Sequence, residues 1–409
     1  MAGRPLQVAV VGGGAAGCFC AIEAKRRHPE AGVTVFEGGP KLLAKLALTG
    51  GGRCNITNTF RDVEQLGEVY PRGEQLMRRA LGVFSQEDTL RWFEAEGVRF
   101  VVQEDQCVFP ESQDAMQIVR TLERCLRQAG VTVRCASSVE RIEALPDGTF
   151  SLHCHPERSR RILSFDKVIV AVGGSSRERL ERLLPEGIEV TPCVPSLFTL
   201  KVADEGLRAL MGTVVPRAGI SLAGTKFRAA GTLLLTDWGV SGPATLRLSS
   251  YAARHLAEKG YTGQLLINWL DAPEAEARAW IASTAAAQAR KQAATTPPEG
   301  LTARLWRHLL GRAALREDRR WAELGAKGSS RLAAVLTADA YPVAGRARFK
   351  EEFVTCGGVS LSGIRLGTLE SKRYPGLFFA GEALDLDAVT GGFNLQAAWS
   401  TGILAARSL

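Results

Sequence analysis

Short apolar runs separated by a stretch of small residues mark the first 40 positions of the chain. The runs at residues 8–11 and 33–36 have the length and the β-branched content of buried strands. Between them lies a stretch of small and apolar residues, which predicts a helix that packs closely on its neighbours. The order strand, helix, strand predicts the opening unit of a parallel sheet in an α/β fold.

The turn between the first predicted strand and the helix carries a GxGxxG spacing. Gly12 permits a tight turn, Gly14 lets the backbone approach a pyrophosphate, and Gly17 lets helix and strand pack closely. The helix start points its free N–H groups at the phosphates, and Glu37, after the second run, can accept a hydrogen bond from a ribose hydroxyl. An ordinary glycine-rich turn would leave this acid unexplained. The pattern therefore predicts a dinucleotide site that comprises Gly12, Gly14, Ala15, Ala16, Gly17 and Glu37.

A second strand–acid–glycine–helix pattern lies near the C-terminus. Residues 377–382 form an apolar run that ends in Glu382, residues 390–398 contain a glycine pair, and residues 400–406 have a helical pattern. Flavoproteins whose dinucleotide-binding fold has two parts are expected to end with this pattern. In them the acid holds the ribityl chain, and the last helix points its positive end at the N1–C2=O edge of the flavin. An NAD-dependent dehydrogenase has no need of such an ending, so the pattern favours tightly bound FAD.

Further motifs carry a resemblance to a known family. They are GGGRCNITN at residues 50–58, GTLLLTDWGVSGPA at 231–244, and TCGGV at 355–359 together with GFN at 392–394. Over nearly its whole length the chain resembles the BaiN/RdsA-type (YhiN-like) bacterial FAD-dependent oxidoreductases of the two-dinucleotide-binding-domain flavoprotein superfamily. One departure is Asp237, where the family is expected to carry a histidine. The role of that histidine cannot be carried over to this chain.

The resemblance implies where the flavin and the chemistry lie. It places the segment around Arg53 beside the flavin, where three glycines allow close approach of the backbone. If the reaction reduces an alkene, a thiol beside the ring can donate the proton that complements the hydride. Cys54 is the first candidate and Cys356 the second, and the alternative for both is a small side chain that only packs. The further residues assigned to the cofactor are Gly51, Gly52, Asn55, Val139, Gly173, Gly381, Glu382, Gly391, Gly392, Phe393, Asn394 and Leu395.

The expected fold class is α/β, with a Rossmann-like FAD-binding domain split into N- and C-terminal parts by a β-rich insertion that carries a small helical subdomain. The N-terminal part includes a hairpin-forming stretch at residues 138–165. The helical subdomain is expected to break into two helical parts at residues 295–300. The predicted borders are 1–190 for the N-terminal FAD-binding part, 191–270 for the β-rich cap domain, 271–330 for the helical subdomain, 331–350 for the return of the insertion and 351–409 for the C-terminal FAD-binding part.

Composition narrows the class of protein. The chain has 409 residues, enough for two or three domains with full cores, and no run of about 20 apolar residues that could span a membrane. Its first residues show none of the features of a signal peptide. Nine cysteines occur without CxxC pairs or metal-ligand spacing, which predicts reduced thiols and no metal site. These features indicate a cytoplasmic protein.

The charge distribution bears on the substrate. The chain carries 51 basic and 43 acidic residues, a formal net charge of +8. Residues 271–331 hold eleven Lys and Arg against seven Asp and Glu, interleaved with Trp280, Trp306 and Trp321. Basic and aromatic side chains in this pattern can hold phosphates and stack bases. The alternative is a solvated helical face whose tryptophans form the core of the subdomain, and taken alone this plainer interpretation is the better one.

The resemblance shifts this balance, because the family includes flavoenzymes that reduce a uridine of large-subunit ribosomal RNA to dihydrouridine. Other members are assigned to small enone or ketone substrates. A basic insertion favours reduction of an RNA uridine. The second hypothesis is reduction or oxidation of a small carbonyl compound, and the third is a flavin-bearing RNA-binding factor without turnover. No second GxGxxG follows Gly17, so NAD(P)H, the expected reductant, would visit the flavin transiently, and oxygen as redox partner stays open.

Overall fold

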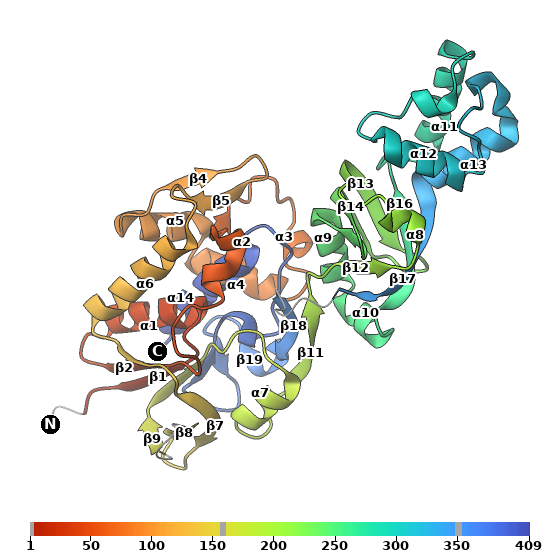
Figure 1. Ribbon diagram of the computed structural model, residues 1–409. Coiled ribbons are helices and arrows are strands. Elements are labelled where there is room, and N and C mark those ends of the chain that lie inside the picture. Colours follow the sequence, from red (N-terminus) through yellow and green to blue (C-terminus); the bar gives the residue numbers. More distant parts are fainter. Residues whose placement is uncertain (1–3, 156–160, 348–353) are drawn as a thin grey trace. The chain divides into compact units, whose positions relative to one another are not determined.

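The computed structural model describes residues 4–155, 161–347 and 354–409 (Figure 1). The chain divides into two compact units. Met1–Val194 and Val354–Leu409 form the first, named here the split unit, and Pro195–Phe353 form the second, named the inserted unit. The expected borders of the insertion were residues 191 and 350.

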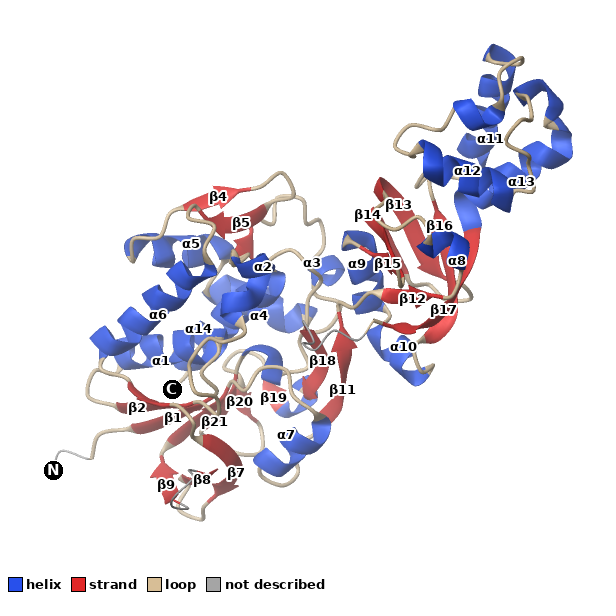
Figure 2. Ribbon diagram, viewed as in Figure 1, coloured by secondary structure: helices blue, strands red, loops and turns tan. Residues whose placement is uncertain are grey.

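A seven-stranded sheet forms the centre of the split unit (Figure 2). Five neighbouring strands, β21, β10, β1, β2 and β6, run parallel, and β20 and β19 continue the sheet antiparallel. Their apolar side chains are largely buried, as expected where helices cover a parallel sheet. The strands predicted at residues 8–11 and 33–36 are confirmed, and the run predicted as a strand at 377–382 forms one over residues 377–379. In sheet order the strands are β19 (Ile364–Arg365), β20 (Glu370–Ser371), β21 (Leu377–Phe379), β10 (Lys167–Val170), β1 (Gln7–Val11), β2 (Gly32–Phe36) and β6 (Thr132–Arg134).

Two of the helices, α1 (Ala15–Arg27) and α14 (Phe393–Ala406), pack closely against each other. Both were predicted, although α14 begins several residues before the helical pattern indicated. A Cβ at Gly402 would lie only 2.8 Å from the carbonyl oxygen of Ala16, so this glycine permits the close approach. The other helices of the split unit are α2 (Thr49–Gly52), α3 (Leu66–Val69), α4 (Glu74–Val83), α5 (Gln86–Ala95), α6 (Ala115–Ala129) and α7 (Arg177–Leu183).

Three small sheets complete the split unit. The stretch predicted to form a hairpin folds into the antiparallel sheet β7-β8-β9, and β3-β5-β4 forms a second one. The third pairs β11, through which the chain leaves for the inserted unit, with β18, through which it returns. The bounds are β3 (Thr57–Asn58), β4 (Phe100–Val102), β5 (Cys107–Pro110), β7 (Ser138–Ala144), β8 (Phe150–His155), β9 (Arg161–Phe165), β11 (Val190–Ser196) and β18 (Val354–Val359).

The inserted unit is built on a closed antiparallel barrel of strand order β12-β15-β14-β13-β16-β17. This confirms the β-rich character expected of the insertion. Alternate residues such as Leu233, Leu235 and Leu265 are fully buried and fill the barrel core. The elements are β12 (Leu200–Val202), α8 (Glu205–Arg208), β13 (Val214–Leu222), β14 (Arg228–Thr236), β15 (Gly239–Ser241), α9 (Pro243–Tyr251), α10 (Ala253–Glu258), β16 (Thr262–Asn268) and β17 (Asp339–Arg346).

A helical subdomain is inserted between β16 and β17 (Figure 1). It contains three helices, α11 (Glu274–Ala287), α12 (Ala303–Arg312) and α13 (Gly325–Ala338), where two helical parts were expected. The helix α13 passes the expected end at residue 330 because Leu332 and Leu336 continue its buried apolar face.

The tryptophans of the subdomain lie in its core. Trp306 and Trp321 are 0 % and 1 % exposed, and Trp280 packs edge-on against both. Side chains buried in this way cannot stack on nucleic-acid bases. The interpretation of Trp306 and Trp321 as a base-stacking surface is therefore wrong, and their role as core residues is confirmed.

A buried carboxylate joins the helical subdomain to the barrel. Asp339, the first residue of β17, is 3 % exposed and accepts hydrogen bonds from Arg312 of α12 at 2.6 and 3.0 Å. It also accepts from the hydroxyl of Tyr341 at 2.6 Å and from the indole of Trp269 at 3.1 Å. His308 of α12 lies 3.2 Å from the Tyr341 hydroxyl. We name these five residues the Asp339 cluster; its hydrogen bonds hold α12 on the barrel.

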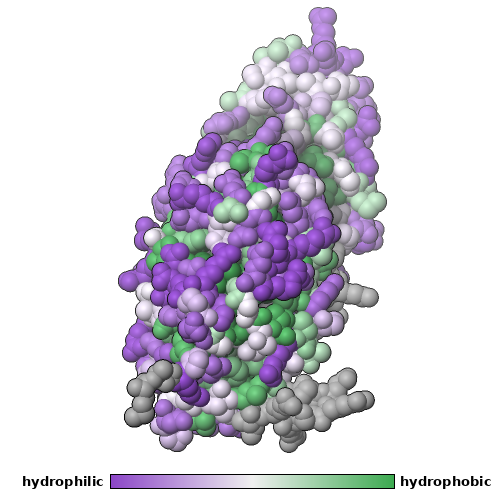
Figure 3. All heavy atoms as spheres, turned by 90° about the vertical axis from the view of Figure 1, so that its left-hand side faces the viewer, coloured by the Kyte–Doolittle hydropathy of each residue, from purple (hydrophilic) through white to green (hydrophobic). Residues whose placement is uncertain are grey.

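Hydrophilic residues dominate the face of the molecule in Figure 3, with hydrophobic residues scattered between them. Within the described ranges, none of the helices combines the length and the apolar character needed to cross a bilayer.

Candidate functional site

The carboxyl ends of the parallel strands β2, β1, β10 and β21 lie at one edge of the sheet, together with the predicted dinucleotide residues. A Cβ at Gly12 would lie 2.3 Å from the Ala171 carbonyl oxygen, and one at Gly17 would lie 1.9 Å from the Gly12 carbonyl oxygen. A Cβ at Gly14, in contrast, would meet no atom within 4 Å. Packing therefore requires Gly12 and Gly17, whereas the space beside Gly14 is open, as close approach of a phosphate requires.

The start of α1 has no side-chain cap. Its N-cap residue is Gly14, and the first helical residues are Ala15 and Ala16, which also carry no polar side chain. The first N–H groups of a helix have no partner within the helix. The N-terminus of α1 therefore offers free donors and a positive dipole end at the edge of the sheet, which suits a pyrophosphate.

Glu37 is fixed next to this turn, at the end of β2. Its carboxylate accepts hydrogen bonds from the backbone N–H groups of Gly13 at 2.9 Å and Gly39 at 2.6 Å. Each carboxylate oxygen can accept a further bond, so a ribose hydroxyl can be an additional donor. The N–H of Ser137 donates to the Glu37 carbonyl at 2.8 Å, which brings the start of β7, with Val139, beside the end of β2.

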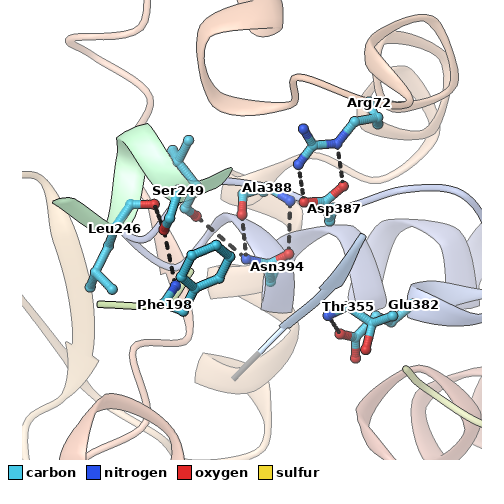
Figure 4. Close-up of polar contacts among 10 residues, drawn as sticks. Arg72, Phe198, Leu246, Ser249, Thr355, Glu382, Asp387, Ala388 and Asn394 are labelled. Carbon is cyan, nitrogen blue, oxygen red and sulfur yellow. Dashed lines mark hydrogen bonds and ion pairs between the residues drawn. The ribbon is translucent and has the colours of Figure 1, made fainter. Parts of the chain in front are cut away.

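Glu382 follows β21 and is held by two backbone donors, one in strand β18 and one in the segment after β10. Its carboxylate accepts from the N–H of Thr355 at 2.7 Å (Figure 4) and from that of Gly174 at 3.0 Å. Burial raises the pKa of Glu382, and the charge of Lys45 and the two backbone donors oppose this rise. A Cβ at Gly173 would lie 3.9 Å from the same carboxylate. The segment after β10 therefore contacts the acid after β21.

A buried hydroxyl lies in the same segment. The Oγ of Ser175 is buried and has no hydrogen-bond partner among the described residues. Native structures seldom leave such a group unpaired unless a ligand or water completes it. On the other side of Glu382, a Cβ at Gly381 would lie 2.8 Å from the Cβ of Ala16, so β21 ends against the start of α1. An unpaired donor and a buried acid at this edge fit a bound polar group.

The GGGRCNITN motif at residues 50–58 and the GFN motif at 392–394 meet at the start of α14. The Asn55 carboxamide donates to the carbonyl of Thr57 at 2.9 Å and accepts from the N–H of Gly392 at 3.2 Å. The amide of Asn58 donates to the carbonyl of Gly391 at 3.1 Å, across 333 positions of sequence. The GGGRCNITN segment is therefore fixed on the glycine pair that precedes the last helix.

The helix α14 begins without a side-chain cap. Its N-cap is Gly392, with a φ of 89°, and Phe393 and Leu395 lie in its first turn. The Tyr70 hydroxyl donates to the Phe393 carbonyl at 3.0 Å, which fixes this turn from the outside. The free N–H groups of α14 thus form a second positive helix end.

Cys54 sits in a segment of unusual backbone conformation. Gly50, Gly51 and Gly52 have φ values of 58°, 69° and 84°, and Cys54, which has a side chain, has 61°. Cys54 is fully buried. Burial raises the pKa of its thiol to about 12, although the Thr49 hydroxyl lowers it in part. The thiol is therefore protonated at neutral pH, as a proton donor must be.

Arg53 is exposed beside this segment. Its guanidinium lies 4.4 Å from the centroid of the Phe109 ring, and its Nε donates to the Gly50 carbonyl at 3.2 Å. Among the described residues no acidic side chain forms an ion pair with it. A Cβ at Gly51 or Gly52 would meet nothing within 4 Å, so the surface beside Arg53 is open.

Sequence reasoning missed the contacts that fix the loop before α14 (Figure 4). Asp387, whose side chain is fully buried, forms an ion pair with Arg72, with 2.6 Å between Nε and Oδ1. The Asn394 carboxamide accepts from the N–H of Ala388 at 2.9 Å and donates to its carbonyl at 3.0 Å. In this structure Asn394, predicted at the cofactor, fixes the loop. Arg72 lies in no motif, so only the fold could identify it.

Cys356 and Asp237 remain to be placed. Cys356 is fully buried on β18, directly after Thr355, and interacts electrostatically with Arg72. Asp237 is exposed in the turn between β14 and β15, and its carbonyl accepts from Nε of Arg208 at 2.6 Å. In the part of the chain that the structure describes, no group of three His, Cys, Asp or Glu side chains is placed to hold a metal ion.

Comparison with known proteins identifies the family. A model described as HI0933-like protein Rossmann domain matches residues 6–408. The chain belongs to this HI0933-like family. It is similar to a 3-dehydro-bile acid delta(4,6)-reductase of Clostridium scindens, with 28 % identity over 98 % of each chain. It is also similar to a ribosomal RNA dihydrouridine synthase of Escherichia coli, with 30 % identity over 98 % of this chain and 97 % of the relative.

A solved quinol-fumarate reductase with menaquinol molecules shares the fold of this HI0933-like chain. The two are 15 % identical, with a TM-score of 0.50 over 99 % of this chain and 71 % of the other. At this identity the likeness shows the fold alone.

The HI0933-like protein is an FAD-dependent oxidoreductase, and its residues fit the cofactor. The uncapped start of α1, the open space at Gly14, two buried or half-buried acids and the unpaired Ser175 hydroxyl lie at one edge of the sheet. The uncapped start of α14 lies against Asn55 and Asn58 of the GGGRCNITN segment. Bound FAD supplies hydride transfer to or from a substrate. The protein supplies binding, orientation and protons.

Proposed function

We propose that this HI0933-like protein reduces the C5=C6 bond of a uridine in large-subunit ribosomal RNA, giving dihydrouridine. The observation that carries the proposal is the distribution of charge. Residues 195–353 hold 22 Lys and Arg against 14 Asp and Glu, whereas the rest of the chain holds 29 of each. The whole formal net charge of +8 therefore lies in the inserted unit, and the split unit is formally neutral. A localised excess of positive charge favours a polyanionic partner.

A small steroid substrate with one carboxylate, such as a bile acid, explains this distribution of charge less well. One carboxylate needs one or two cations in a pocket, not an excess of charge over a whole unit. Two relatives, from Escherichia coli and Haemophilus influenzae, carry the name ribosomal RNA dihydrouridine synthase, and one carries the name of a bile-acid reductase. Both reactions reduce an activated C=C bond, so the reaction class is shared and the charge favours RNA.

The proposal gives roles to residues of the split unit. The N-terminus of α1 binds the pyrophosphate, Glu37 the adenosine ribose, Glu382 the ribityl chain, and the N-terminus of α14 the N1–C2=O edge of the flavin. NAD(P)H is the proposed source of the hydride. The reduction adds this hydride to one carbon of the double bond and a proton to the other. Cys54 is the proposed donor of that proton; because its side chain is fully buried, this role requires the Gly50–Gly52 segment to move and expose Sγ, after which the thiolate takes a proton from solvent.

The test is anaerobic reoxidation of the reduced holoprotein. The protein is loaded with FAD, reduced with NADPH or NADH, and mixed with a large-subunit ribosomal RNA transcript that contains no modified bases. We expect the RNA to reoxidise the flavin and one uridine to gain two hydrogen atoms by mass spectrometry. A conjugated 3-keto bile acid is the competing substrate.

Three results would each contradict the proposal in a different way. Reoxidation by the bile acid but not by RNA would assign a small-enone reductase. RNA binding without reoxidation would indicate an RNA-binding flavoprotein without turnover on RNA. Reoxidation by neither substrate, followed by fast reoxidation when air is admitted, would indicate an oxidase.

A further inference from the structure

Two loops of the helical subdomain run side by side and bring distant basic residues together. The N–H of Ala293 donates to the carbonyl of Arg319 at 2.8 Å, and the N–H of Trp321 donates to that of Lys291 at 3.0 Å. Gln292 and Arg320 form an antiparallel bridge between the same loops. Trp321, which follows one of the loops, is buried in the core of the subdomain and fixes that loop in place. We name the exposed basic residues of this place and of the adjoining first turn of α13 the basic end: Arg290, Lys291, Arg319, Arg320 and Lys327.

The acidic residues next to the basic end are already engaged. Asp318 pairs with Arg316 at 2.7 Å, and Glu317 lies 3.7 Å from Arg307. The Glu323 carboxylate accepts from the backbone N–H of Arg320 at 3.3 Å. No ion pair to a residue of the basic end is present among the described residues. Arg319 donates from Nε to the Glu323 carbonyl at 2.9 Å and interacts electrostatically with Asp318, so its charge is compensated in part. The five side chains nevertheless stay exposed, and the basic end keeps an excess of positive charge.

The chemistry of the basic end suits phosphates and not bases. Guanidinium and ammonium groups bind phosphate oxygens through charge and hydrogen bonds. Base recognition needs exposed aromatic side chains or a fixed pattern of donors and acceptors. The three tryptophans of the subdomain form its core, and Trp306 and Trp321 are almost fully buried. The surface therefore carries charge without aromatic platforms.

We propose that the basic end binds the sugar–phosphate backbone of the RNA substrate, independently of its sequence. This inference rests on the proposed function, since it assumes an RNA substrate. In this proposal the inserted unit supplies affinity through phosphate contacts, and the split unit selects and reduces the uridine. Binding through the basic end should then appear in KM for RNA and leave kcat unchanged.

The experiment measures RNA affinity as a function of salt concentration. The holoprotein is titrated into a fluorescent fragment of large-subunit ribosomal RNA at several salt concentrations. Neutralising two phosphate contacts with Arg290→Gln/Lys291→Gln should lower the slope of log K against log salt by about 1.4–1.8. Adding Arg319→Gln/Arg320→Gln should lower it by roughly the same amount again. All four side chains are exposed, so FAD content and thermal unfolding should match the wild type.

Two controls separate charge at this place from total charge and from folding. Arg78→Gln/Arg79→Gln removes the same charge from exposed positions of α4 in the split unit and should leave the slope unchanged. Arg290→Lys/Arg319→Lys keeps the charge and should bind RNA like the wild type. An acidic polypeptide, polyglutamate, should compete with RNA only weakly.

Each result has a distinct meaning. If the four-fold variant has the salt slope of the Arg78/Arg79 control, the basic end does not bind RNA, although the proposed function stands. Equal competition by polyglutamate would assign an acidic protein as partner and overturn the inference. If the wild type neither binds RNA nor is reoxidised by it, the proposed function itself fails.

Discussion

Replacement of Asp339 by alanine tests the joint between the barrel and the helical subdomain. The carboxylate accepts four hydrogen bonds, two from Arg312 and one each from Tyr341 and Trp269. Its side chain is 2 % exposed and that of Arg312 is 30 % exposed. Asp339→Ala removes the acceptor and leaves a half-buried cation and two buried donors without their partner.

The magnitude follows from these contacts. Loss of one partner of a buried ion pair costs about 3–5 kcal/mol. Arg312 keeps contact with water, with the Ala340 carbonyl at 2.8 Å and with Asp204 at 3.6 Å, so the lower limit of about 3 kcal/mol applies to the pair. The unpaired Tyr341 and Trp269 donors add roughly 1 kcal/mol together, since small movements can bring them to water. We expect a loss of about 4 kcal/mol, or a fall in Tm of about 8–16 °C for a unit of this size.

The assay is thermal and urea unfolding of the holoprotein followed by tryptophan fluorescence. The matched control is Asp318→Ala, which breaks an ion pair whose side chains are 81 % and 59 % exposed, and which should cost less than about 1 kcal/mol. If both variants lost the same stability, burial of the Asp339 cluster would not contribute as argued.

Four further predictions concern the split unit and its pH response. The Gly14→Ala variant should fold but lose FAD, because a Cβ there meets only the space for phosphate. The Gly17→Ala variant should lose both its fold and FAD, because a Cβ there overlaps the Gly12 carbonyl oxygen. Circular dichroism and flavin absorbance distinguish the two variants. Cys54→Ala should retain FAD and slow substrate reduction about 10²–10⁴-fold in single turnover, and unchanged turnover would leave Cys54 a packing residue. Glu382→Ala should weaken FAD at least about tenfold by fluorescence titration, and wild-type affinity would contradict its ribityl role. Burial lowers the pKa of His308, so stability should fall as pH drops through the usual histidine range, and His308→Gln should reduce this fall in urea titrations at several pH values.

The sequence predicted those parts of the fold that depend on local pattern. The glycine turn requires a strand before it and a helix after it, and β1 and α1 confirm both. The apolar run before Glu382 likewise became β21. In each of these cases the physical reason lies within a few residues of the motif, so a single sequence is enough.

Contacts between distant residues could not be predicted in this way. Arg72 and Asp387 pair across 315 positions, and neither residue has a local signal. The tryptophans of the helical subdomain show a different limit. A helical segment in which an Arg lies near a Trp fits both a nucleic-acid surface and an amphipathic packing face, and only the three-dimensional packing decides between them. The basic end was hidden for the same reason, because two separate loops and the first turn of α13 form it.

Glu382 links cofactor binding to the folding of the split unit. Its carboxylate accepts from Gly174, shortly before the chain leaves through β11, and from Thr355, where the chain returns in β18. The same acid therefore joins the two sides of a 159-residue insertion. Because burial raises its pKa, the ionised form is disfavoured in the native state, and stability from this group is lost as pH rises through its native pKa. A ligand hydroxyl that donates to the carboxylate offsets part of that loss. FAD bound at this edge then stabilises the folded split unit by mass action, because the unfolded chain cannot hold both backbone donors next to the acid.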